Sequence, residues 1–123
     1  KTIRSGGNII GEPGVVMFRK SILEKSGPFD ASIYYVMDLF TWFKMLKHGD
    51  LYSLPDVICA FRISHASEST KIIDKQRGDV DAFINKIYSD KSYNLTSTNY
   101  RLGLLNSRMA AIAKKAIYKL LIR

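Results

Sequence analysis

The chain has 123 residues, of which 46% are hydrophobic and 24% are charged, a composition typical of one globular domain with its own core. No run approaches about 18 consecutive apolar residues, so the sequence predicts no membrane span. Residues 1–90 carry 12 basic and 11 acidic side chains, whereas residues 91–123 carry seven basic and no acidic ones. This asymmetry argues against a uniformly basic nucleic-acid-binding fold and indicates a basic tail that attaches to something anionic.

The first 30 residues predict loops, one strand and one short helix. Residues 5–8, SGGN, have turn chemistry, and the chain starts at Lys1 without a Met, which predicts a piece of a longer protein. Residues 15–18 are a short apolar run, read as a buried strand. Residues 19–26 fit a short helix that Gly27 and Pro28 end. Neither of the two common phosphate-binding glycine motifs is present.

Residues 35–50 predict the central helix of the chain. Its apolar positions recur at the spacing of one helical face: Leu39, Trp42, Phe43 and Leu46. Asp38 stands at the start, so a core-packed helix holds one carboxylate at its N-terminal end, which suits a catalytic acid or base. The alternative is a structural N-cap, because Asp is a favoured capping residue.

The second half of the chain predicts two strands and two helices. Residues 51–54 and 57–63 are read as strands broken by Pro55 and Asp56, with Cys59 as a buried thiol in a reducing compartment. A helix capped by Ser67 or Ser69 is predicted to run to about Tyr88, weakened by Gly78. The last helix is predicted from about Tyr100 to the end, with one apolar stripe and one basic stripe.

Several pieces of the first 70 residues resemble the C-terminal half of a family 2 glycosyltransferase catalytic domain, of the inverting GT-A type. Residues 8–13 (NIIGEP) and 15–19 (VVMFR) are similar to the family's IGEP and VLFRR segment. Residues 27–30 (GPFD) are similar to its FDE turn, and Met37-Asp38 with residues 39–46 to its DLWLRLL helix. The family's last elements, GD, FR, H and S, match residues 49–50, 61–62, 65 and 69 in order. The resemblance covers a little over half of the chain.

This resemblance implies a mechanism. An acidic residue at the start of the acceptor-side helix, here Asp38, deprotonates an acceptor hydroxyl that attacks the anomeric carbon of a nucleotide-diphosphate sugar and inverts it. The family binds the donor through an Asp-x-Asp motif and a divalent metal, Mg or Mn. In the family this motif lies in the N-terminal half, and no Asp-x-Asp precedes Asp38 in this chain, so the donor site and the metal would belong to a missing N-terminal half, and the chain alone is expected to be inactive. The pattern departs from the family at Met37, Phe40 and Lys44.

Five further residues are candidates for the site. Gly11, Glu12 and Trp42 are expected at the acceptor pocket, although Glu12 could be an ordinary loop acid and Trp42 a core residue. Arg62 could reach a diphosphate or lie on the surface at the end of a strand. His65 is a metal ligand in some family members, and its alternative is a surface loop.

The resulting prediction is an α+β, helix-rich fold, the C-terminal portion of a GT-A domain with a few short strands, over residues 1–66, followed by a helical extension over residues 67–123. The predicted function is sugar transfer to a saccharide or lipid-linked saccharide in bacterial surface polysaccharide synthesis, in the cytoplasm or on the inner face of the membrane. Residues 100–123 are predicted to contact an anionic membrane surface. The alternative is a small basic, non-enzymatic module that contacts nucleic acid or anionic membrane through its last helix, with nucleic acid the less favoured partner.

Overall fold

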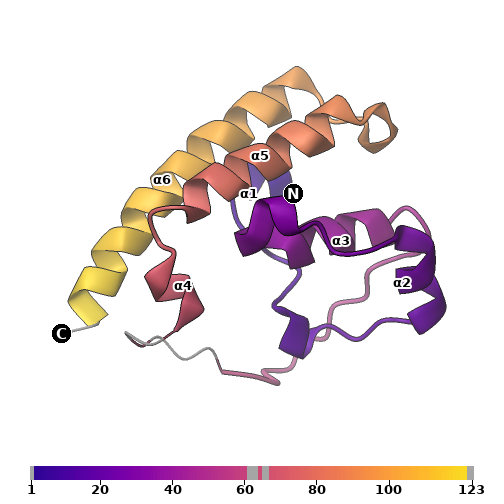
Figure 1. Ribbon diagram of the computed structural model, residues 1–123, viewed down its shortest axis with the longest axis horizontal. Coiled ribbons are helices and arrows are strands. Elements are labelled where there is room, and N and C mark those ends of the chain that lie inside the picture. The colour runs from indigo at the N-terminus through magenta and orange to yellow at the C-terminus, as the bar shows by residue number, and fades with distance from the viewer. Residues whose placement is uncertain (1, 61–63, 65–66, 122–123) are drawn as a thin grey trace.

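The computed structural model describes residues 2–60, 64 and 67–121, and within these ranges every regular element is helical. Figure 1 shows the arrangement. The α-helices are α1 (Thr2–Ser5), α2 (Lys20–Ser26), α3 (Met37–Met45), α4 (Glu68–Lys71), α5 (Gln76–Ser89) and α6 (Ser97–Leu121). Short 3-10 helices are η1 (Pro13–Val15), η2 (Ala31–Val36) and η3 (Lys91–Tyr93).

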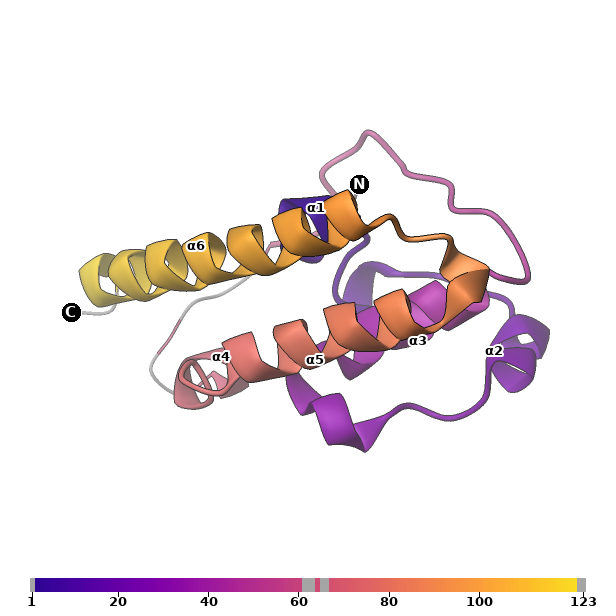
Figure 2. The ribbon, with the colours of Figure 1, turned by 90° about the horizontal axis from the view of Figure 1, so that it is seen from above.

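Helices α5 and α6 form an antiparallel pair that runs along one side of the molecule (Figures 1 and 2). The 3-10 helix η2 packs on α5 and leads directly into α3. Helix α3 meets α5 through its Phe40 and Phe43 rings, which pack against Phe83. The short α1 packs on the first half of α6. The N-terminal segment is therefore held between the central helix and the last helix of the chain.

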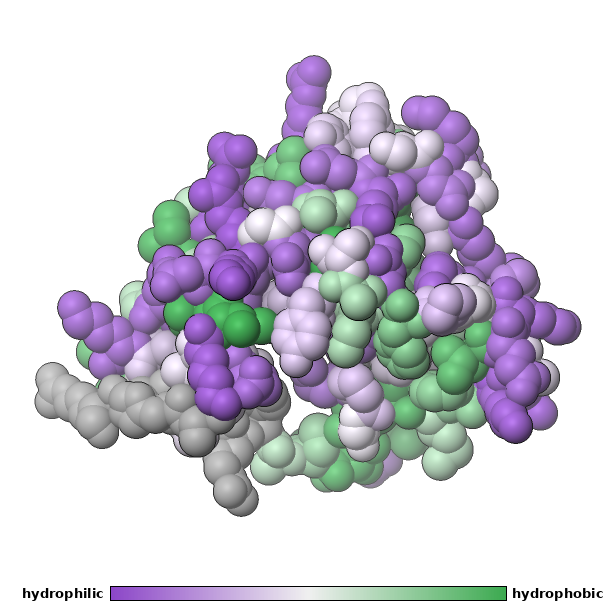
Figure 3. All heavy atoms as spheres, in the orientation of Figure 1, coloured by the Kyte–Doolittle hydropathy of each residue, from purple (hydrophilic) through white to green (hydrophobic). Residues whose placement is uncertain are grey.

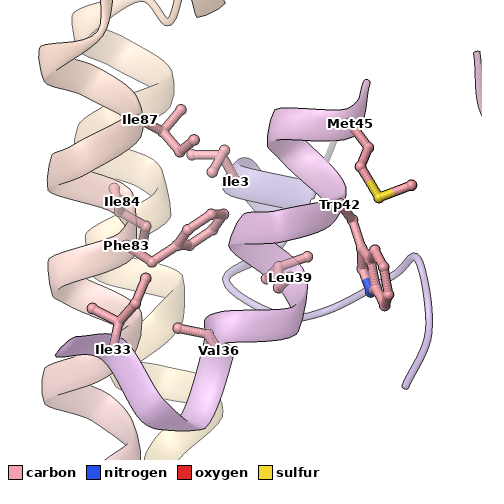
Figure 4. Packing of buried hydrophobic residues seen from close by; sticks show 9 residues of the cluster. All are labelled: Ile3, Ile33, Val36, Leu39, Trp42, Met45, Phe83, Ile84 and Ile87. Atoms are coloured by element: carbon pink, nitrogen blue, oxygen red, sulfur yellow. The ribbon is translucent and has the colours of Figure 1, made fainter. Parts of the chain in front are cut away.

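One hydrophobic core joins residues from both halves of the sequence (Figure 4). Phe83, Ile84 and Ile87 occupy the inner face of α5 and are each at most 2% exposed. They meet the side chains of η2 and α3, and the Phe43 ring packs edge-on against Phe83 with centroids 5.2 Å apart. The buried cluster consists of Ile3, Ile33, Val36, Leu39, Trp42, Met45, Phe83, Ile84 and Ile87.

The prediction of short strands is wrong for the described residues, and with it the α+β fold class. Residues 16–19 and 51–60 are extended or irregular and belong to no sheet. Alternating apolar residues form a strand only where a neighbouring strand completes the ladder and another layer covers the apolar face. Here Met17 is 99% exposed and Val57 96%, so neither condition is met. The predicted end of the second strand, residues 61–63, lies outside the described residues.

The helix predictions fare better than the strand predictions. The helix expected over residues 19–26 is confirmed as α2, and Gly27 ends it with a φ of +76°. The central helix is confirmed as α3. Thr41, which is not among the predicted apolar positions, is nevertheless fully buried, and its hydroxyl donates to the Met37 carbonyl at 2.8 Å. The single helix expected up to Tyr88 is divided into α4 and α5. Cys59 is exposed, so the prediction of a buried thiol is wrong.

Helix α6 packs against the body through a different face from its apolar stripe. The buried positions are Gly103, Ser107 and Tyr118, which recur on one side of the helix. A Cβ atom on Gly103 would lie 2.7 Å from the Ile3 carbonyl oxygen, so glycine lets α1 approach the backbone of α6 closely. The stripe of larger apolar residues therefore points to the opposite side of α6.

Candidate functional site

A cavity of about 170 Å³ lies where α1, the following loop, η2, α3, α5 and α6 come together. Its floor is apolar, formed by core side chains that include Leu39, Phe83 and Ile84. Its polar lining brings together side chains from distant parts of the sequence: Asn8, Glu12, Tyr35, Asp38, Gln76, Arg77, Ser107 and Lys114. Two of the residues predicted from the sequence, Glu12 and Asp38, thus line the same cavity.

Asp38 is held at the start of α3, with only 8% of its surface exposed. It is the second residue of the helix, and the N-cap position belongs to Val36. One oxygen, Oδ1, accepts the Leu39 backbone N–H at 2.7 Å. Burial raises the pKa of the Asp38 carboxyl, and the backbone hydrogen bonds offset part of this rise. Asp38 makes no ion pair with any described cation, so its carboxylate is available to another proton donor.

Glu12 lies at the solvent-exposed rim of the cavity, just before η1. The Asn8 side chain organises the preceding loop: its Oδ1 accepts the N–H groups of Ile10 and Gly11 at 3.0 and 3.1 Å. The pKa of Glu12 is raised by partial desolvation and by the Asp38 charge, while the Lys114 ammonium lowers it. The Glu12 and Asp38 carboxylates therefore repel each other, and the Lys114 ammonium of α6 offsets part of the effect on Glu12.

Lys114 and Tyr35 also line the cavity. The Lys114 Nζ donates to the Tyr35 hydroxyl at 2.7 Å and lies 4.9 Å from that ring's centroid and 5.2 Å from that of Tyr118. Burial lowers the pKa of Lys114, whereas desolvation raises the pKa of Tyr35 to about 12. Tyr35 is held in place because its backbone N–H donates to the Asp79 carboxylate at 2.8 Å.

Sequence reasoning missed both Lys114 and Tyr35. Lys114 was counted only as one charge of the basic tail, and Tyr35 only as the start of the central segment. A signal for Lys114 did exist, because it lies at i+7 from Ser107 and i−4 from Tyr118, on the helical face that proves to be buried. That signal identifies a face of α6 but not the residues that it meets.

Gly11 and Trp42, two further predicted site residues, do not line this cavity. Trp42 is 3% exposed and belongs to the core, and its Nε1 donates to the Gly11 carbonyl at 3.1 Å. One edge of Trp42 faces a second, mostly apolar cavity of about 400 Å³, where the Phe18 ring lies 5.4 Å from it. Gly11 thus anchors the core tryptophan. Arg62 and His65 lie outside the described residues.

The described residues do not form a metal site. Among them no group of three or more His, Cys, Asp and Glu side chains is close enough to hold a metal ion. The cavity offers only two carboxylates, and the Lys114 ammonium beside them repels a second cation. The chemistry of this donor set is that of proton transfer and hydrogen bonding to a polar molecule, with the nearly buried Asp38 carboxylate as one proton acceptor.

Comparison with known proteins gives one similarity. No family model matches the chain, and no solved structure matches it. The chain is 30% identical over 74 residues to an uncharacterized protein of Mycobacterium tuberculosis (strain CDC 1551 / Oshkosh). That match covers 60% of this chain but only 23% of the mycobacterial protein, so the chain spans less than a quarter of that relative's length.

Proposed function

We propose that this chain forms the acceptor side of an inverting sugar transferase in which the Asp38 carboxylate is the general base. The observation that supports this most directly is the position of Asp38, a nearly buried carboxylate at the start of a core-packed helix, facing a cavity that has an apolar floor and several polar side chains in its lining. The motif resemblance of residues 8–69 to family 2 glycosyltransferases supplies the reaction class. Glu12, which the sequence suggests for the acceptor pocket, lines the same cavity.

The proposed step is a single displacement. An acceptor hydroxyl in the cavity gives its proton to a carboxylate oxygen of Asp38, and its oxygen forms a bond to the anomeric carbon of the donor sugar. The bond from that carbon to the diphosphate breaks, and the electron pair leaves with the nucleoside diphosphate. Burial raises the pKa of Asp38 and makes it a stronger base than an exposed carboxylate, which favours proton transfer near neutral pH.

The other polar groups of the cavity orient the acceptor in this proposal. Glu12 accepts a hydrogen bond from a second hydroxyl at the rim. The Tyr35 hydroxyl, fixed by Lys114 at 2.7 Å, offers a neutral donor or acceptor because its pKa of about 12 keeps it protonated. A saccharide, free or lipid-linked, presents several hydroxyls at the spacing that such a set of groups can bind.

The donor sugar nucleotide and the divalent metal of the resembled family belong, in this proposal, to a part of the protein other than the described residues. We place the reaction in the cytoplasm, where nucleotide sugars are made, in the synthesis of a bacterial surface polysaccharide. Among the described residues no helix is long and apolar enough to cross a membrane.

The test uses the whole natural protein, including any donor-binding part. We expect Asp38→Asn to lower transfer by about 10²–10⁴-fold, the usual contribution of a general base. Transfer is measured as nucleoside diphosphate released from a panel of UDP-, GDP- and dTDP-sugars in the presence of cell-envelope acceptors. The matched control is Asp74→Asn, at an exposed position that does not line the cavity. Transfer by a folded Asp38→Asn protein at the rate of the control would overturn the proposal.

A further inference from the structure

Helix α6 presents a stripe of large apolar side chains to solvent. Leu105, Met109, Ile112 and Leu120 are 55%, 60%, 66% and 70% exposed, respectively. They follow one another at i, i+4, i+7 and i+15, which places them on one face of the helix. The buried residues Ser107 and Tyr118 and the partly buried Lys114 lie on the opposite face. The apolar stripe is thus left over after α6 has packed against the body.

A row of basic side chains borders this stripe. Arg101, Arg108, Lys115 and Lys119 follow at i, i+7, i+14 and i+18, so they form a line along one edge of the apolar face. No acidic residue occurs after Asp90. Lys115 pairs with Asp74 at 2.6 Å, but both side chains are more than half exposed, and such a pair is weak enough to exchange for another anion.

Figure 3 shows the two kinds of side chain next to each other along the edge of the molecule that α6 forms. The helix has 25 residues and no acidic side chain, and it is not apolar enough to span a bilayer. Apolar residues along one face with Arg and Lys beside them are the pattern of a helix that lies in the headgroup region of a membrane. There the apolar side chains enter the acyl boundary and the basic ones contact lipid phosphates.

We propose that the exposed face of α6 docks the protein on the surface of an anionic phospholipid bilayer. Nucleic acid would neutralise the basic row but leave the apolar stripe in water. A second copy of the chain could cover the stripe, but residues 91–123 would offer no acidic side chain to the basic rows. The proposal is independent of sugar transfer, since Asp38 and its cavity lie on the other side of α6.

The test is flotation of the full chain with lipid vesicles. We expect binding to phosphatidylcholine vesicles that contain about 30% phosphatidylglycerol, and much weaker binding to phosphatidylcholine alone, because each basic residue near an anionic surface contributes about a fivefold gain in partitioning. Raising the salt from about 0.1 M to about 0.5 M shortens the Debye length and should release most of the protein. Ile112→Glu should reduce partitioning at least about tenfold by placing a charge in the apolar stripe.

Matched variants separate the surface from general effects of charge. Val57→Glu puts the same charge at an apolar side chain that is 96% exposed on a loop, and Lys20→Ala removes a basic side chain that is 89% exposed on α2. Both should bind vesicles like the wild type, as should Asp38→Asn. Arg108→Ala and Lys119→Ala should each lose about fivefold. Circular dichroism confirms that the exposed substitutions leave the helices intact.

Four results would overturn the proposal. Equal binding to neutral and anionic vesicles would remove the role of the basic row, and unchanged binding of Ile112→Glu would remove that of the apolar stripe. The chain could instead bind neither kind of vesicle and be a dimer when measured by light scattering. If Ile112→Glu abolishes that dimer, the apolar stripe serves self-association. The last result is a chain that binds neither kind of vesicle but binds a duplex oligonucleotide. If Arg108→Ala weakens that binding and Ile112→Glu does not, the basic row contacts nucleic acid instead.

Discussion

The Nζ atom of Lys114 donates a hydrogen bond of 2.7 Å to the Tyr35 hydroxyl, and this contact joins the last helix to the segment that precedes Asp38. The two residues are 79 positions apart in the sequence. Lys114 also lowers the pKa of Glu12, although that pKa remains above its ordinary value because of desolvation and the nearby Asp38 charge. The charge balance of the cavity therefore depends on a residue of the C-terminal helix.

We expect Lys114→Met to raise the pKa of Glu12. Methionine keeps most of the aliphatic length of lysine but removes the ammonium. The positive charge that lowers the Glu12 pKa is then lost, while the repulsion from the Asp38 carboxylate remains. The measurement is the pH titration of the Glu12 side-chain carboxyl carbon by NMR. Lys115→Met is the matched control, because the neighbouring Lys115 pairs with Asp74 outside the cavity. An identical titration of Glu12 in both variants would show that Lys114 does not act on it.

We expect Asp38→Asn to raise the thermal stability of the chain at pH 7. The pKa of Asp38 is higher in the folded state than its ordinary value near 3.9, so the folded protein holds the proton more tightly than the unfolded one. The free energy of unfolding therefore falls as the pH rises from the pKa of Asp38 in the unfolded chain to its pKa in the folded protein. Ionised Asp38 consequently destabilises the fold at pH 7. Asparagine removes the charge, and its Oδ1 can still accept the Leu39 N–H.

The gain from Asp38→Asn should disappear below about pH 4, where the wild-type carboxyl is also neutral. Asp90→Asn provides a comparison of opposite sign. Lys47 lies 2.6 Å from Asp90 and, with Ser92, lowers its pKa to about 2, so Asp90 stabilises the fold above its unfolded pKa and loses that effect as the pH falls toward 2. Melting temperatures of both variants across the pH range test these signs. A variant Asp38→Asn that is less stable than the wild type at pH 7 would contradict burial of the charge.

The helices could be predicted because their signals are local. Gly27 ends α2 where the sequence places it, and Leu39 and Trp42 mark the buried face of α3. The predicted strands failed because an alternating apolar pattern records only that one side could be buried, and Val57 has nothing beside it to bury against among the described residues. Strand formation depends on a partner that the local sequence does not specify.

The site was predictable only in part, for the same reason. Asp38 could be chosen because a lone acid at the start of an apolar helix is visible in the sequence. Its neighbours Tyr35 and Lys114 could not, since their contact depends on which face of α6 turns inward. The largest apolar residues suggested one face, but the small residues Gly103 and Ser107 form the contact with α1 and the cavity. The close approach of the α1 and α6 backbones at Gly103, and not the apolar stripe of α6, therefore decides which face of α6 turns inward.

We expect Gly103→Ala to destabilise the fold by about 1–3 kcal/mol, the usual cost of overpacking a tight contact. An added Cβ would lie 2.7 Å from the Ile3 carbonyl oxygen and 3.1 Å from its side chain. Ile3 is 6% exposed and is part of the core, so it cannot move away without disturbing the packing of α1 on α6. Thermal and urea unfolding followed by circular dichroism measure the loss.

Gly78→Ala is the matched control for this change. Gly78 lies inside α5, and an added Cβ would meet no atom within 4 Å. Alanine there should stabilise the fold by about 0.5–1 kcal/mol, because glycine is a poor helix former and loses more backbone entropy on folding. The two glycine substitutions should therefore act in opposite directions. Equal stabilisation by both would mean that α1 does not pack on α6 at Gly103, and the cavity beside Asp38 would then lack one of its walls.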